Sequence, residues 1–189
     1  MTSPIAFVGL GAMGFAMAEN LIKHQRRVVG FDVRPETLKR FEAVGGTSAA
    51  TVPAACAGAD TLIIMTVNAD QAEDVLFAKG GCDALAPGAT VIVMATCAPA
   101  RIVAIAEKVA LTGRHFIDAP VSGGVVGATG GTLVIMAAAP KSIYAKHEAM
   151  LKILGSNLFF LGEKAGQGAS MKIVNQLLCG VHIAAAAEG

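Results

Sequence analysis

Short apolar runs alternate with helix-length segments along most of the 189-residue chain, and this alternation limits the fold more than any other feature. The runs are rich in β-branched residues, which is typical of buried strands. We expect strands at Ile5–Val8, Val28–Asp32, Thr61–Thr66, Thr90–Met94, His115–Ala119, Thr132–Ala137 and Asn157–Leu161. We expect helices between them, at Ala12–His24, Pro35–Val44, Ala69–Ala78, Pro99–Leu111 and Lys141–Leu154. A repeated βα pattern predicts an α/β fold with a doubly wound, mostly parallel sheet.

The composition agrees with a sheet that is covered on both faces. Hydrophobic residues make up 54% of the chain and charged residues 15%, and the mean hydropathy is +0.60. A disordered chain could not bury so much apolar surface, so that class is excluded. The uncharged apolar runs are far shorter than the ~20 residues that cross a bilayer, so we expect no membrane span.

Charge and cysteine usage exclude further classes. The net charge is +1, and no basic stripe offers a surface for nucleic acid. The four cysteines contain no CxxC pair and the histidines do not cluster, so we assign neither a disulfide framework nor a metal. The N-terminus lacks the features of a signal peptide, and a cytoplasmic protein is expected.

A glycine motif, Gly9-Leu10-Gly11-Ala12-Met13-Gly14, follows the first expected strand and opens the first expected helix. Gly9 allows the tight turn, Gly11 lets a pyrophosphate approach the backbone, and Gly14 lets the helix lie close to the sheet. Phosphates then lie at the helix N-terminus, where free N–H groups and the helix dipole favour anions. In this context the motif predicts a Rossmann-type dinucleotide-binding fold.

The end of the second expected strand bears on the choice of cofactor. Asp32 lies 18 residues after Gly14, where a carboxylate accepts hydrogen bonds from a ribose diol. The same carboxylate repels a 2′-phosphate, so NAD is expected and NADP is the less favoured cofactor. Arg34 keeps the alternative open, because an arginine near this position accommodates the phosphate. The other interpretation of Arg34 is a solvated charge on the surface.

A second motif, Asp118–Gly124, ends a later strand. The Ser122 hydroxyl and the backbone N–H groups of Gly123 and Gly124 would form an anion nest for a substrate carboxylate. A plain glycine turn is the alternative. Thr96 follows another strand and precedes a helix, where it would cap that helix or contact the nicotinamide half of a cofactor.

A third motif, Gly166–Gln176, contains Lys172 and Asn175, which share one face of a helix. A lysine on an apolar, partly buried helix is a candidate for a lowered pKa and for acid–base chemistry. The alternative is a surface lysine whose stem lies along the helix. Ser170 is the expected N-cap of this helix, which would run from Met171.

The last helix runs through four alanines to Gly189. We expect it to continue in a longer protein, of which this chain would be a fragment, or to dock on a partner subunit. We therefore divide the chain into residues 1–165, an NAD-binding domain, and residues 166–189, the start of an interdomain helix. The apolar side chains of this helix predict a homo-dimer or tetramer.

Three stretches of the chain, Phe7–Gly14, Asp118–Gly124 and Gly168–Gln176, resemble in order the signatures of the β-hydroxyacid dehydrogenase family. That family includes 3-hydroxyisobutyrate dehydrogenase and the tartronate and succinic semialdehyde reductases. The stretches around Val67-Asn68-Ala69 and Val174–Ile183 resemble its L-threonate dehydrogenase branch. Members of the family run about 100 residues longer than this chain, in a helical domain.

The resemblance implies hydride transfer between NAD and a small hydroxy acid, with Lys172 as the proton-transfer residue. It implies a substrate site made of Ser122, Gly123, Gly124 and Asn175. It implies a cofactor site made of Gly9, Gly11, Ala12, Met13, Gly14, Asp32, Arg34, Val67, Asn68 and Thr96. A non-catalytic dinucleotide-binding interaction module is the rival from another class, and relatives of that kind lack the lysine.

Overall fold

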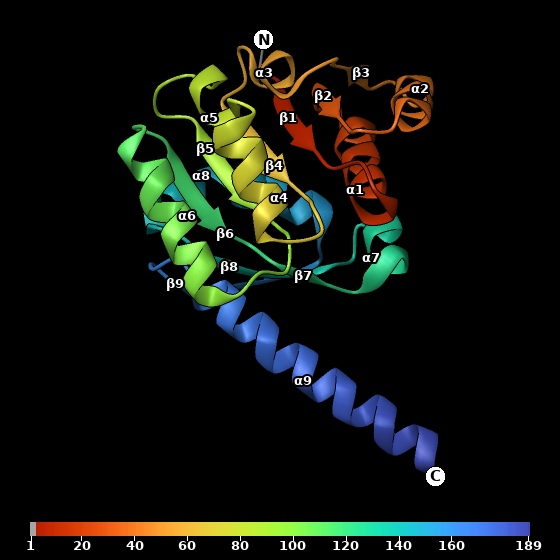
Figure 1. Ribbon diagram of the computed structural model, residues 1–189. Coiled ribbons are helices and arrows are strands. Elements are labelled where there is room, and N and C mark those ends of the chain that lie inside the picture. Colours follow the sequence, from red (N-terminus) through yellow and green to blue (C-terminus); the bar gives the residue numbers. More distant parts are fainter. Residues whose placement is uncertain (1–2) are drawn as a thin grey trace.

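A computed structural model describes residues 3–189 and shows a nine-stranded sheet with helices on both faces (Figure 1). The strands are β1 (Ile5–Val8), β2 (Val28–Phe31), β3 (Thr47–Ser48), β4 (Thr61–Ile64), β5 (Thr90–Val93), β6 (His115–Asp118), β7 (Val121–Ser122), β8 (Val134–Ala138) and β9 (Asn157–Gly162). The helices are α1 (Ala12–Lys23), α2 (Pro35–Ala43), α3 (Val52–Cys56), α4 (Ala69–Glu73), the π-helical turn η1 (Asp74–Ala78), α5 (Gly81–Ala84), α6 (Pro99–Leu111), α7 (Gly124–Gly130), α8 (Lys141–Leu154) and α9 (Gln167–Glu188).

The strand order is β3-β2-β1-β4-β5-β6-β8-β7, with β9 paired to β8. The pairs from β3 to β6 are parallel, whereas β8 is antiparallel to both β6 and β7. The prediction of a doubly wound, mostly parallel sheet is confirmed. The reversal of β8 was not predicted, because an apolar run has the same sequence pattern whichever way the strand points.

Five parallel strands end in register at one edge of the sheet. Val8 at the end of β1 pairs with Phe31 of β2 and with Ile64 of β4. Ile64 pairs with Val93 of β5, which pairs with Asp118 of β6. The segments that follow these strands therefore leave the sheet along one line. They contain most of the residues predicted to bind cofactor and substrate.

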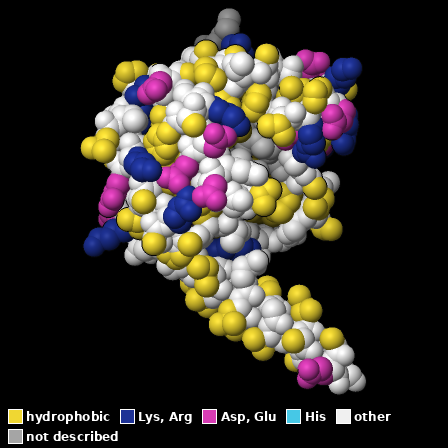
Figure 2. All heavy atoms as spheres, viewed as in Figure 1, with side chains coloured by type: hydrophobic (Ala, Val, Ile, Leu, Met, Phe, Trp, Pro, Cys, Tyr) yellow, Lys and Arg dark blue, Asp and Glu magenta, His cyan; other side chains and the backbone are white. Residues whose placement is uncertain are grey.

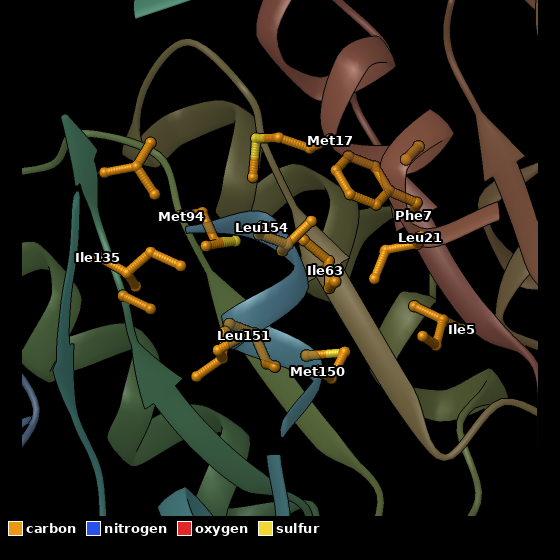
Figure 3. Close-up of a cluster of buried hydrophobic side chains, with 14 of the residues drawn as sticks. Ile5, Phe7, Met17, Leu21, Ile63, Met94, Ile135, Met150, Leu151 and Leu154 are labelled. Carbon is orange, nitrogen blue, oxygen red and sulfur yellow. The ribbon is translucent and has the colours of Figure 1, made fainter. Parts of the chain in front are cut away.

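Alternate residues of each strand enter two separate cores. On one face Phe7 and Ile63 pack with residues of α1 and α8, such as Met17 and Leu151 (Figure 3). On the other face, Ala6, Val8, Leu62 and Ile64 pack under the helices α3 to α6. Burial on both faces accounts for the continuous apolar strands and for much of the high mean hydropathy.

The helix α1 lies in direct contact with the turn that precedes it. A Cβ atom placed on Gly14 would lie 1.9 Å from the carbonyl oxygen of Gly9 and 3.2 Å from the Phe7 ring. Gly9 itself has φ +95°, and its Cβ would lie 2.4 Å from the Met65 carbonyl oxygen. Both glycines are therefore required by the fold, as the motif predicted.

One predicted helix start is wrong, and one of the two roles considered for Thr96 is not observed. The last helix begins at Gln167 rather than Met171, and Ser170 lies inside it, where its hydroxyl donates to the Gly166 carbonyl at 2.7 Å. Thr96 does not cap α6, whose N-cap residue is Ala98. In the first case a carboxylate from β6 caps the helix, so the chain needs no capping side chain next to it.

The helix α9 extends away from the rest of the molecule and ends far from the sheet (Figure 1). Apolar side chains lie along its length, as Figure 2 shows. The exposed ones are Met171, Ile173, Val174, Leu177, Leu178, Val181 and Ile183, each between 45% and 70% exposed. In the part of the chain that the structure describes, no helix is long and apolar enough to cross a membrane.

The close contact between α1 and the glycine turn predicts that a methyl group added at Gly14 destabilises the fold. The substitution Gly14→Ala should lower the free energy of unfolding by at least about 2 kcal/mol, because the added carbon overlaps backbone that cannot move aside. The matched control is Gly180→Ala, which adds a methyl group in α9 where, in the described chain, no atom beyond the adjacent backbone of the helix itself lies within 4 Å. It should be neutral or stabilise by up to about 1 kcal/mol. Urea unfolding followed by circular dichroism measures both, and equal effects would contradict the close contact.

Candidate functional site

A cavity of about 400 Å³ lies at the carboxyl edge, beside the ends of β1, β2 and β4. It brings together five of the predicted cofactor-binding residues, namely Gly9, Gly11, Asp32, Arg34 and Val67. Nine further residues line it, and four of these lie on the segment after the β4 loop, namely Gln71, Asp74, Val75 and Lys79. These four come from α4, η1 and the residue after η1, and their order in the chain gives no sign that they face the glycine turn.

The N-terminus of α1 opens beside this cavity. Its N-cap residue is Gly11, with no side-chain cap and no acidic residue in the first turn. The first-turn N–H groups, including those of Ala12, Met13 and Gly14, have no partner within an α-helix. A Cβ on Gly11 would meet only the Arg34 guanidinium, at 4.0 Å. Packing within the described chain thus leaves room against Gly11 for a ligand, and this geometry fits a pyrophosphate.

Asp32 and Arg34 form one compact unit beside the glycine turn. The Asp32 carboxylate accepts hydrogen bonds from the Leu10 backbone N–H at 2.8 Å and from the Arg34 backbone N–H at 3.0 Å. The Arg34 side chain donates to it at 2.9 Å and 3.3 Å. Burial raises the pKa of Asp32, but the hydrogen bonds from Arg34 and Leu10 outweigh burial and hold the pKa below its usual value. The carboxylate is therefore ionised and already paired.

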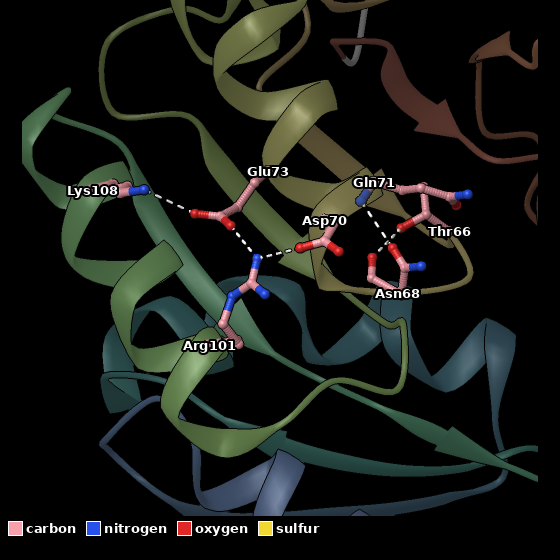
Figure 4. A network of polar contacts seen from close by, with 7 residues as sticks. All are labelled: Thr66, Asn68, Asp70, Gln71, Glu73, Arg101 and Lys108. Atoms are coloured by element: carbon pink, nitrogen blue, oxygen red, sulfur yellow. Dashed lines mark hydrogen bonds and ion pairs between the residues drawn. The ribbon is translucent and has the colours of Figure 1, made fainter.

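The loop after β4 is held by its own side chains (Figure 4). Asn68 caps α4 by accepting from the Gln71 backbone N–H at 3.0 Å, and the Gln71 side chain accepts from the Val67 N–H at 3.0 Å. The arrangement resembles a capping box, except that the Gln71 side chain accepts from the residue before the N-cap rather than from the N-cap residue itself. It leaves Val67 79% exposed at the cavity. Asn68, predicted to contact the cofactor, caps a helix here and does not line the cavity.

Ion pairs tie α4 to α6 behind this loop (Figure 4). Arg101 of α6 pairs with Asp70 at 2.6 Å and also with Glu73. Lys108, two turns further along α6, pairs with Glu73 at 2.8 Å. The pairs are largely exposed, so their effect is to orient α4 rather than to add much stability.

The second motif forms a turn between β7 and α7. Ser122 ends β7, and Gly123 and Gly124 have φ values of +125° and +60°, which favour glycine. A Cβ on Gly124 would find no atom within 4 Å. The turn thus leaves open space beside the backbone at the start of α7. This geometry suits an anion nest, and the substrate role of these three residues stays a prediction.

Lys172 is buried on the first part of α9, with only 6% of its surface exposed. Burial lowers its pKa, and the nearby Cys179 thiol partly opposes this effect. The structure therefore excludes a surface lysine. Asn175 lies on the same face, donates to Cys179 Sγ at 3.9 Å, and has a buried Oδ1 with no partner among residues 3–189. The Cys179 thiol itself is exposed.

Asp118, at the end of β6, is the residue whose role the sequence analysis missed. It is 1% exposed, and its Oδ2 accepts from the backbone N–H groups of Gly166 at 2.9 Å and Ala169 at 3.0 Å. Its Oδ1 has no partner in the described part of the chain. Burial raises the pKa of Asp118 to about 6 against the opposing effect of these N–H donors. The sequence did contain a signal for this role, because Asp118 is an acidic residue at the end of a buried strand.

The remaining predicted residues share the edge of the sheet but not the cavity. Thr96 is exposed after β5, while Ser122, Lys172 and Asn175 lie outside the lining of the cavity. Within residues 3–189, no group of three or more histidine, cysteine and acidic side chains is placed to hold a metal ion.

Comparison with known proteins agrees with this geometry. Residues 4–162 match the family described as the NAD binding domain of 6-phosphogluconate dehydrogenase. The chain is 41% identical to L-threonate dehydrogenase of Cupriavidus necator, over all of this chain and 64% of that protein. It is 36% identical to 3-hydroxyisobutyrate dehydrogenase of Pseudomonas aeruginosa, over 97% of this chain and 62% of that protein.

A solved structure shows the same likeness. The crystal structure of 3-hydroxyisobutyrate dehydrogenase from Salmonella typhimurium is 34% identical, with a TM-score of 0.93 over 99% of this chain and 66% of that one. The chain thus spans less than two thirds of the length of these relatives. Their names confirm the resemblance to the β-hydroxyacid dehydrogenases. Because the family match covers most of its length, the chain belongs to the family of the NAD-binding domain of 6-phosphogluconate dehydrogenase.

Proposed function

We propose that this chain binds NAD and contributes the proton-transfer residue of a hydroxy-acid dehydrogenase, with L-threonate as the substrate. The observation that carries the proposal is the burial of Lys172 on the first part of α9, which is attached to the end of β6 at the same edge of the sheet as the cavity. Burial lowers the pKa of this lysine, so it releases its proton more readily than an exposed lysine does, which suits a proton-transfer residue. The alternatives within the family are 3-hydroxyisobutyrate dehydrogenase and tartronate or succinic semialdehyde reductase.

The cofactor would lie across the carboxyl edge. The first turn of α1 and Gly11 would hold its pyrophosphate, and Asp32 with Arg34 its adenosine ribose. Val67 and Thr96 would flank the remaining half, with Asn68 fixing the loop between β4 and α4. A bound nicotinamide supplies the group that accepts or gives the hydride.

The chain's own residues would supply binding and proton transfer at the substrate. The Ser122 hydroxyl and the N–H groups of Gly123 and Gly124 would hold the substrate carboxylate. Lys172 Nζ would take the hydroxyl proton during oxidation and return it during reduction. Asn175, on the same face of α9, would orient the substrate hydroxyl beside that amine.

We further propose that residues 1–165 form the NAD-binding domain and that residues 166–189 begin the connection to a helical domain. The length of the relatives supports this division. The apolar side chains exposed along α9 support a homo-dimer or tetramer in which they are covered.

The role of Lys172 predicts a separation of chemistry from cofactor binding. In the whole protein, Lys172→Met should lower kcat by about 10²-fold or more while the Kd for NAD stays within about twofold. Lys152→Met is the matched control, because that lysine is exposed on α8 and pairs only with Glu148 in the described chain. NADH absorbance with a panel of the four candidate substrates measures turnover, and fluorescence titration measures binding.

Two outcomes would contradict the proposal. Loss of NAD binding in Lys172→Met would make the lysine structural. An unmodified protein that binds NAD but turns over none of the hydroxy acids would instead be the non-catalytic binding module.

The cofactor preference depends on Asp32. We propose that NAD binds more tightly than NADP, because the ionised carboxylate accepts from the ribose and repels a 2′-phosphate. Asp32→Ser should narrow the difference between the two Kd values by about tenfold, since it frees the Arg34 guanidinium for the phosphate. Asp60→Ser, at the opposite edge of the sheet, is the control. If the unmodified protein already prefers NADP, then Arg34 outweighs Asp32 and the assignment is wrong.

A further inference from the structure

The first turn of α9 is attached to the sheet through one buried carboxylate. Asp118 Oδ2 bridges the N–H groups of Gly166 and Ala169, which are three residues apart in the chain. These two donors belong to the N-cap residue and the first turn of α9, where N–H groups have no partner within the helix. A side chain from β6 therefore caps a helix that begins 49 residues after β6 ends in the sequence.

Close packing accompanies this cap. A Cβ on Gly168 would lie 2.4 Å from the Met136 carbonyl oxygen and 2.9 Å from the Asp118 carbonyl oxygen. The backbone of α9 thus touches both β8 and β6 at this point. The helix cannot slide or tilt here without losing either the hydrogen bonds or the contact.

The attachment is confined to the start of the helix. The buried residues of α9 are Gly168, Ala169 and Lys172. From Ile173 onward the side chains are half-buried or exposed, and the helix leaves the body of the molecule (Figure 1). Lys172 follows Ala169 by three residues, so it lies on the face of the helix that Asp118 holds against the sheet.

The same carboxylate lies near the loop after β5. Burial raises the pKa of the Cys97 thiol to about 11, and the negative charge of Asp118 adds to this effect. Cys97 follows Thr96, the residue proposed to flank the cofactor. Asp118 is thus close both to the loop proposed to flank the cofactor and to the helix that carries Lys172.

We propose that Asp118 is a positioning residue for Lys172. By fixing the first turn of α9 to the end of β6, it sets where the Lys172 amine lies relative to the cofactor side of the sheet. The inference rests on the proposed function of Lys172, but the attachment itself is measurable without turnover. The competing explanation is a cap that stabilises the fold and has no effect on the amine.

The test is Asp118→Asn in the whole protein, with Asp60→Asn as the matched control for loss of a carboxylate. Asparagine keeps the shape and one accepting oxygen, but it removes the charge that strengthens both hydrogen bonds and leaves a buried amide N–H group without an acceptor in the described chain. We expect amide hydrogen exchange at Gly166 and Ala169 to quicken at least about tenfold. The pKa of Lys172, measured by carbon NMR on labelled lysine, should move up toward its usual value because the amine becomes more hydrated. We expect kcat to fall about tenfold or more, with the Kd for NAD within about twofold.

Each result has a defined meaning. An unchanged Lys172 titration and an unchanged kcat in folded Asp118→Asn would overturn the proposal. If Lys172→Met keeps full activity while Asp118→Asn still shifts the Lys172 titration, the proposed function fails and the positioning stands. If Asp118→Asn does not fold, hydrogen exchange in the unmodified protein decides. Gly166 and Ala169 amides that exchange as fast as those of Leu177–Ile183 would refute the attachment, and slow exchange would support it.

Discussion

The register of the parallel strands is the constraint on which the rest of the structure depends. Because Val8, Ile64, Val93 and Asp118 lie on one line across the sheet, every segment that follows them emerges at the same edge. Helix N-termini and polar side chains from distant parts of the sequence therefore meet there. The register is fixed in turn by burial on both faces, since a shift of one residue would exchange the residues of the two cores.

The sequence was sufficient for the parts of the fold that rest on local chemistry. The roles of Gly9 and Gly14 follow from the spacing of the motif between a strand and a helix, and the overlaps found at both positions bear this out. Elements without periodicity, such as β3 and α5, gave no pattern to detect. The start of α9 was misplaced for a different reason. Its cap comes from Asp118, which is distant in the sequence, and a search for capping residues next to the helix selects Ser170 instead.

The residues of the candidate site that belong to a sequence motif were predictable. The contacts between them that depend on packing were not. Asp32 was recognised as a ribose acceptor, but the sequence does not tell that Arg34 lies against it with two side-chain hydrogen bonds. That pairing matters for the choice of cofactor, because the Arg34 guanidinium is occupied by Asp32 and a 2′-phosphate would have to compete with the carboxylate for it. Similarly, Lys172 was identifiable as a candidate, but only its burial separates it from a surface lysine.

The N-termini of α1 and α9 both lie at this edge, but only that of α9 is capped by a side chain. This difference indicates that the two N-termini have different roles. The first turn of α1 has neither a side-chain cap nor an acidic residue, so its N–H groups and dipole are left for an anion from outside the chain. The first turn of α9 has a carboxylate of the protein itself in the equivalent place, which satisfies the N–H groups and would repel a second anion. A helix capped in this way serves as an attachment rather than a binding site. Its function must therefore come from the side chains that the attachment orients, and among its buried residues only Lys172 has a side chain that transfers protons.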